Sequence, residues 1–146
     1  MLYEYSLLGL IISVGFIWLT GIYPGGIIVP FYLVLFINQP LRIATTVAIA
    51  LVTVALYRLS GRFIILFGRR RFLFMIICGG LVSWFFHFFF TRFYPLPLEL
   101  RAIGMIIPGL MANQCERQGV LLTLASLAIV LVLTWLAGTL VFQVVL

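Results

Sequence analysis

The sequence predicts an all-α integral membrane protein with about four transmembrane helices and two short broken or re-entrant segments, arranged in two repeated halves. Hydrophobic residues make up 65% of the 146 positions, and nine arginines and three glutamates carry all of the formal charge. A soluble domain of this size needs a polar surface that such a composition does not supply. Long uncharged stretches separate the charges. The length allows one polytopic membrane domain over residues 1–146.

The first half begins with a long apolar stretch and continues with a short one. Tyr5–Tyr23 is long enough to cross a hydrocarbon layer of about 30 Å. Pro24-Gly25-Gly26 then breaks the chain. Ile27–Ile37 contains Pro30, and as a helix it would reach only about 16 Å. This length favours a re-entrant segment or a broken helix over a full span.

A short span and an arginine-rich connection follow. Ile43–Tyr57 lies between Arg42 and Arg58, whose long side chains can extend outward to the membrane interface. Leu59–Arg71 is interpreted as an interfacial loop or helix. The region 58–71 is therefore predicted to be a cytoplasmic loop joining the two halves, since arginine concentrates on that side of a membrane.

The second half repeats this plan. Phe72–Thr91 has no charge and is a clear span with aromatic side chains toward its end. Ala102–Cys115 is short and is interrupted by glycine and proline. Gln118–Leu146 provides the last long span.

Two sequence blocks indicate an internal repeat of residues 1–60 and 72–146, approximately. Gly26-Ile27-Ile28-Val29-Pro30 is similar to Gly104-Met105-Ile106-Ile107-Pro108, at an offset of 78 residues. An Asn-Gln pair follows each block, at Asn38-Gln39 and at Asn113-Gln114. Chance similarity between apolar segments is the alternative, but the shared Gly, Pro and Asn-Gln favour a repeat. Interrupted segments in matching positions are typical of binding sites in transporter-like folds.

The orientation of the repeats depends on whether the short segments cross the membrane. Without crossing, each half has two spans, the repeats are parallel, and both termini lie in the cytoplasm with the arginine cluster. With crossing, each half has three spans, the repeats are inverted, and both termini lie outside. The short lengths favour the first arrangement.

The clustered arginines predict contact with anionic lipid or with a partner protein. The candidate residues are Arg62, Arg69, Arg70 and Arg71. In a soluble protein such a cluster would suggest nucleic acid, but between hydrophobic spans it favours a cytoplasmic loop near lipid headgroups. We therefore expect no nucleic-acid partner.

The sequence contains no recognisable catalytic or metal-binding pattern. It has a single histidine, no aspartate and no glycine-rich phosphate loop. The two cysteines lack a pairing or metal-ligand spacing. His87 lies among aromatic residues, which favours packing at the interface over a role as a proton relay. We expect a non-catalytic chain without a metal or cofactor of its own.

Polar residues beside the short segments are the strongest candidates for binding. Arg42 follows Asn38-Gln39-Pro40, and Arg101 precedes the second short segment. Such groups near lipid must pair, reach the interface or line a wet cavity. A net-positive lining for an anionic substrate and simple extension to the interface both remain open. The candidate site residues are Gly26, Pro30, Asn38, Gln39, Arg42, Arg101, Gly104, Pro108, Gly109 and Asn113.

Four blocks, in this order and spacing, resemble the CapC/PgsC family, the membrane subunit of bacterial poly-γ-glutamate capsule synthase. They are Thr20–Pro30, Asn38-Gln39-Pro40, Phe67–Phe72 and Arg101–Asn113, with Gln118-Gly119 at the end. The chain departs from the family at Phe31, where glycine is common, and at Trp18-Leu19, where an acidic residue is frequent. The resemblance therefore does not extend to an ion pair or backbone bend at those positions.

The resemblance implies a multi-pass subunit in the bacterial cytoplasmic membrane that supports polymerisation of glutamate and translocation of the anionic polymer. A separate Mur-ligase-like subunit would use ATP and Mg²⁺, and further membrane subunits would assist export. Membrane lipid is a further partner, and four spans are few for a polymer channel, so a homo-oligomer is also expected. Two alternatives are an autonomous small transporter or channel and a structural anchor for the ligase.

Overall fold

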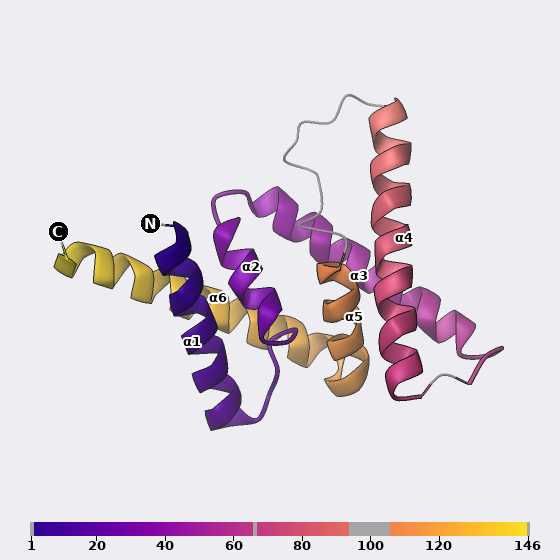
Figure 1. Ribbon diagram of the computed structural model, residues 1–146, viewed down its shortest axis with the longest axis horizontal. Helices are drawn as coiled ribbons and strands as arrows, with labels where there is room; N and C mark the ends of the chain where they lie inside the picture. The colour runs from indigo at the N-terminus through magenta and orange to yellow at the C-terminus, as the bar shows by residue number, and fades with distance from the viewer. Residues whose placement is uncertain (1, 66, 94–105, 146) are drawn as a thin grey trace.

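The computed structural model describes residues 2–65, 67–93 and 106–145, and these contain six α-helices and no strand (Figure 1). The helices are α1 (Leu2–Thr20), α2 (Ile28–Leu35), α3 (Pro40–Ser60), α4 (Arg69–Phe93), α5 (Ile107–Gln118) and α6 (Val120–Val145). The predicted all-α class is confirmed.

Four of the helices, α1, α3, α4 and α6, are long and apolar enough to cross a membrane. Large apolar side chains cover their outer faces, and Trp18, Leu121 and Val144 are each more than four-fifths exposed. Such a surface would be costly in water, whereas lipid solvates it. The prediction of an integral membrane protein with four long apolar helices is confirmed.

Three predicted boundaries were wrong. Helix α3 begins at Pro40 rather than Ile43, because proline lacks an N–H and suits the first helical position. Helix α4 begins at Arg69, so the three consecutive arginines form its first turn rather than part of a loop. Gln118 ends α5, and Gly119, with φ of 100°, separates it from the last long helix.

The two short helices pack against the long ones. At 1.5 Å per residue, α2 would be about 12 Å long and α5 about 18 Å long, so neither reaches across a bilayer alone. The buried core cluster contains four α5 residues, more than from any other helix. Its members are Val29, Leu33, Ala50, Val54, Met75, Ile107, Met111, Ala112, Cys115 and Leu127.

Each half packs partly on the other. Helix α1 packs against α2 and α6, while α4 packs against α5 and α3. In Figure 1, α1 and α4 run in opposite directions, as do α2 and α5 and the long helices α3 and α6. The three helices of the second half therefore point opposite to their counterparts in the first.

Helices α4 and α5 cross closely at two glycines. A Cβ atom placed on Gly79 would lie 2.7 Å from the Cα of Gly109, and one on Gly109 would lie 2.7 Å from the Cα of Ile76. Small residues allow two helix backbones to approach this closely within a membrane. The crossing fixes α5 against α4.

Candidate functional site

One cavity brings the two short segments together at what we call the arginine-rich end, where α3 ends and α4 begins. This end carries Arg58, Arg62, Arg69, Arg70 and Arg71. The cavity, here named the arginine-end pocket, has a volume of about 350 Å³. Its walls come from the α1–α2 connection, α2, α4 and α5. They comprise Tyr23, residues 25–29, Phe72, Leu110, Asn113 and Gln114.

The glycines of the α1–α2 connection shape one wall of this pocket. Gly25 and Gly26 have φ values of 77° and 111°, a region that glycine adopts at little cost and other residues rarely enter. A Cβ atom on Gly25 would lie 3.7 Å from the Cγ of Met111. The turn therefore brings the chain close to α5 just before α2 begins.

Gln118, the last residue of α5, fixes this connection in place. Its Oε1 accepts a hydrogen bond from the Tyr23 backbone N–H at 3.1 Å, and its Nε2 donates to the Tyr23 carbonyl. The same Nε2 donates to Thr123 Oγ1 at 3.1 Å. One amide thus joins the α1–α2 connection to the end of α5 and the start of α6, and all of its polar atoms are used.

The pocket walls are apolar apart from backbone groups, the Tyr23 hydroxyl and two side-chain amides. Asn113 is only 8% exposed, while Gln114 is half-buried. No charged side chain lines the cavity within the part of the chain that the structure describes. The nearest acid along α5, Glu116, accepts a hydrogen bond at 3.2 Å from Arg58 Nε.

The start of α4 concentrates positive charge beside this pocket. Phe72 lines the cavity and directly follows Arg69, Arg70 and Arg71, and no acidic residue lies in this first turn. Arg71 is half-buried, and its Nε makes no hydrogen bond to any described residue. Because a helix N-terminus is itself positive, this arrangement favours an anionic neighbour.

The candidate site residues fall into separate groups. Gly26 and Asn113, from different halves, line the arginine-end pocket together. Pro30, Pro108 and Gly109 are buried in the interior but do not line it. Their positions indicate packing around the pocket rather than contact with a ligand in it.

The residues after α2 lie at the opposite end of the molecule, where α1 begins and α6 ends. Asn38 lines a cavity of about 230 Å³ with Tyr5 and Thr139. The Arg42 guanidinium lies over the Phe36 ring, 5.1 Å from its centre, at cation–π distance. Gln39 precedes α3 at this corner. Arg101 and Gly104 lie outside the described residues.

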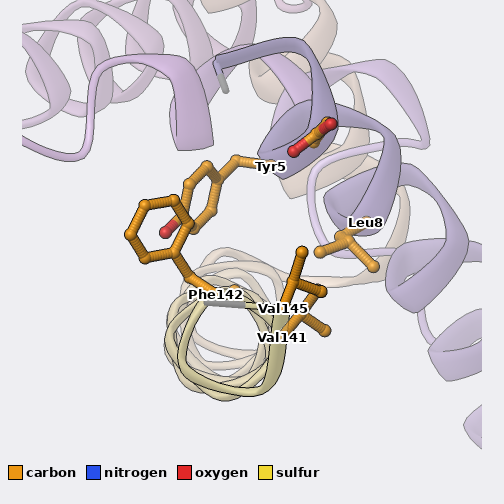
Figure 2. Close-up of a pocket in the computed structure, with 7 residues that line it drawn as sticks. Tyr5, Leu8, Val141, Phe142 and Val145 are labelled. Carbon is orange, nitrogen blue, oxygen red and sulfur yellow. The ribbon is translucent and has the colours of Figure 1, made fainter.

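A further cavity at this opposite end, between α1 and α6, has a volume of about 290 Å³. Figure 2 shows the Tyr5 ring beside the Phe142 ring, with Leu8 near Val141 and Val145. Gly138 admits the Tyr5 ring, since a Cβ atom there would overlap it. The charged group in its lining is Glu4, so this apolar cavity does not suit an anion.

Catalytic and metal-binding groups are sparse in the described ranges. No group of three or more His, Cys, Asp or Glu side chains there is placed to hold a metal ion. His87 is exposed on α4, and Cys78 and Cys115 are free thiols.

Sequence reasoning did not assign a role to three residues of this region. Phe72 begins a predicted span and Tyr23 ends one, and both lie in blocks that carry the family resemblance, but the sequence assigns neither of them a contact in this pocket. Gln118 was placed at the start of the last span, although it closes α5 and holds Tyr23. The polar run Gln114–Gln118 was a signal, but it does not reveal a bond partner 95 residues away.

Comparison with known proteins decides the family. The family described as capsule biosynthesis CapC matches residues 8–124. The chain belongs to the CapC family. It is 39% identical over 130 residues to the PGA biosynthesis protein CapC of Bacillus subtilis (strain 168), covering 86% of this chain and 85% of that protein. It is also 39% identical over 127 residues to the capsule biosynthesis protein CapC of Bacillus anthracis, with the same coverage. No solved structure is significantly similar to this CapC-family chain.

Proposed function

We propose that this CapC-family chain is the membrane subunit of a poly-γ-glutamate synthase complex and supports both polymerisation of glutamate and translocation of the anionic polymer. The observation that carries the proposal is family membership over most of the chain, at 39% identity to a PGA biosynthesis protein. The four long apolar helices support a place in the membrane. The cytoplasmic membrane of a bacterium is the proposed location.

Bond formation is assigned to a partner in this proposal. Joining glutamates through an amide requires activation of a carboxylate, which an ATP-dependent, Mur-ligase-like subunit would provide with its own Mg²⁺. This chain offers no aspartate and one exposed histidine. The proposed role is therefore that of a non-catalytic subunit, working with the ligase and with further export subunits.

The arginine-rich end is the proposed contact surface for the ligase or for anionic lipid. Arg62, Arg69 and Arg70 are exposed there, and exposed guanidinium groups suit carboxylates and phosphates. Replacing Arg69, Arg70 and Arg71 together with Ser should reduce co-purification of the ligase. Unchanged co-purification would leave these residues with lipid contact only.

The arrangement of the helices supports a proposal that the halves form an inverted repeat. Counterpart helices run in opposite directions in Figure 1, and α1 packs on α6 as α4 packs on α3. If the arginine-rich end faces the cytoplasm, both termini then lie outside. A C-terminal reporter active only outside the cell would test this, and cytoplasmic activity would contradict it.

The function is tested by reconstitution in a host that makes no poly-γ-glutamate. The host expresses the neighbouring Mur-ligase-like protein with or without this chain, and γ-linked polymer is measured inside and outside the cells. We expect polymer outside the cells only when both proteins are present. Any additional export subunits are supplied in every arm.

Each other outcome has a defined meaning. Equal polymer inside and outside without this chain would contradict the proposed function. Intracellular polymer without this chain, but export only with it, would restrict the role to translocation. Restoration of polymer and export by tethering the ligase to an unrelated membrane helix would show that the chain is an anchor. Polymer movement by the purified chain alone would show an autonomous transporter.

A further inference from the structure

The arginine-end pocket contains hydrogen-bond donors that have no acceptor in the described part of the chain. Helix α2 begins at its wall with no side-chain cap. The backbone N–H groups of Ile27, Ile28 and Val29 make no hydrogen bond within the described residues. An uncapped helix start normally finds such a partner in a side chain, water or a ligand. Since Ile27 and Ile28 cannot provide one, the acceptor must come from elsewhere.

An independent side chain from the other half presents a further donor. Asn113, in the middle of α5, is more than nine-tenths buried and lines this same pocket. Its amide makes no hydrogen bond to any described residue. The amide atoms of Asn113 are not among the buried side-chain atoms that lack a hydrogen-bond partner, so they are reached from the cavity that Asn113 lines. The amide can therefore donate a hydrogen bond to a polar ligand beside the uncapped start of α2.

The charge around the pocket specifies the sign of that ligand. A helix N-terminus favours negative charge, and the three arginines of the α4 first turn lie next to the lining residue Phe72. No carboxylate lines the pocket in the described ranges, and Glu116 is paired with Arg58.

We propose that the arginine-end pocket binds a carboxylate group of a γ-linked glutamyl chain, held by the start of α2 and by the Asn113 amide. This inference rests on the proposed function for the identity of the polymer. The pocket volume of about 350 Å³ admits one glutamyl unit but not a folded polymer. The adjoining exposed arginines would contact the next carboxylates along the chain, which explains why charge surrounds the pocket rather than lining it.

Binding is tested on the full-length purified chain, without the ligase, in nanodiscs of neutral lipid. The probe is a γ-linked glutamyl decamer, and its analogue with the α-carboxylates converted to amides is the negative control. We expect the decamer to bind and the amidated analogue to bind at least tenfold more weakly. Equal binding of the two, or no binding of either, would overturn the proposal.

Variants then assign the binding to this pocket. Asn113→Leu removes the donor at similar volume, and Asn113→Asp adds a like charge. Each should weaken decamer binding about tenfold or more, the equivalent of about 1.4 kcal/mol. Gln143→Leu, near the exposed end of α6 and outside the pocket lining, is the control and should bind like the parent chain. Unchanged binding by folded Asn113 variants would overturn the assignment.

A second measurement does not depend on the Asn113 variants being stable. Gln114→Cys, in a chain with Cys78→Ala and Cys115→Ala, places a thiol in the pocket wall. Maleimide labelling of that thiol should slow when the decamer is added. Equal labelling rates with and without the decamer would overturn the proposal.

Competition distinguishes the polymer from other anions. Inorganic phosphate and nanodiscs containing phosphatidylglycerol are added separately against the labelled decamer. Weak displacement by both is expected. Displacement by the lipid at a lower concentration than by unlabelled decamer would overturn the polymer assignment in favour of a lipid phosphate. Failure of binding together with successful reconstitution would remove the pocket's role and leave the proposed function standing.

Discussion

The two short helices look alike in sequence but differ in what they do for the fold. Helix α2 has eight apolar residues and packs mainly against α1 and α6. Helix α5 has twelve residues, seven of them buried, and packs against α2, α3, α4 and α6. Helix α5 is therefore the central packing element, whereas α2 contributes its uncapped start to the pocket.

A repeated Gly/Pro pattern therefore does not imply that the two helices have equal roles. Phe31 follows Pro30 in α2, while Gly109 follows Pro108 in α5. Phe31 is half-buried and packs edge-on against Tyr32 at 5.5 Å. Gly109 touches the backbone of α4. One pattern thus supports an aromatic contact in one half and a close backbone crossing in the other.

The largest expected effect comes from closing that crossing. In Gly109→Leu, the new Cβ atom would lie 2.7 Å from the Ile76 Cα and 2.8 Å from the Met75 carbonyl. Neither backbone atom can move without shifting a helix. Overpacking typically costs about 1–3 kcal/mol and sometimes more, and we expect the upper part of that range or failure to fold. The measurement is the yield of monodisperse protein and its melting temperature.

Two control variants test whether the effect is specific to position 109. Gly15→Leu, on α1, places its Cβ atom where nothing lies within 4 Å, so it should fold like the parent chain. Phe31→Leu changes the matching position of α2 and should lower the melting temperature much less than Gly109→Leu. Equal losses at positions 31 and 109 would contradict the unequal roles of the two helices.

A smaller effect is expected from releasing the α1–α2 connection. Gln118→Leu removes both hydrogen bonds to Tyr23 and the one to Thr123. The Tyr23 backbone N–H and carbonyl and the Thr123 hydroxyl each lose a hydrogen-bond partner. Because the hydrogen bonds to Tyr23 are exposed and water can replace Gln118 there, the expected cost is about 0.5–1.5 kcal/mol, measured as a lower melting temperature in detergent. Decamer binding should also weaken, because the start of α2 loses its fixed position.

The matched control for this variant is Gln143→Leu, because Gln143 is exposed near the end of α6. It should leave both the melting temperature and decamer binding unchanged. If Gln118→Leu behaves in the same way, the amide does not hold the connection, and the coupling between α5 and the start of α2 must have another origin.

The helical class and the four long spans were predictable because they depend on composition and local length. Uncharged stretches such as Phe72–Thr91 can be solvated only by lipid. The two short interior segments were also predictable, since Pro24-Gly25-Gly26 and Pro108-Gly109 limit helix length. Helix ends were less predictable. Helix α4 begins on the three charged residues Arg69–Arg71, and the periodicity of apolar residues gives no sign of a helix start there.

The pocket was only partly predictable, because its walls depend on contacts between distant segments. Gly26 and Asn113 were both candidates, but nothing in their spacing shows that they line the same pocket. The spacing also does not show that Asn38 lies at the opposite end of the molecule. The Gln118–Tyr23 contact spans 95 residues. These contacts depend on the direction of the second half relative to the first. The short segment lengths favoured parallel repeats. The counterpart helices in Figure 1 instead run in opposite directions.

The smallest expected effect is at the ion pair that ties α5 to α3. The Arg58 side chain is 62% exposed and that of Glu116 is 22% exposed, with Nε and Oε2 3.2 Å apart. Exposed pairs typically contribute about 0–1 kcal/mol, and salt screens them. A double-mutant cycle of Arg58→Gln and Glu116→Gln should give a coupling energy within that range that falls as salt increases. A coupling well above it, unaffected by salt, would show a shielded pair. Charge would then contribute to the position of α5, whereas α2 contains no charged residue and no ion pair can hold it.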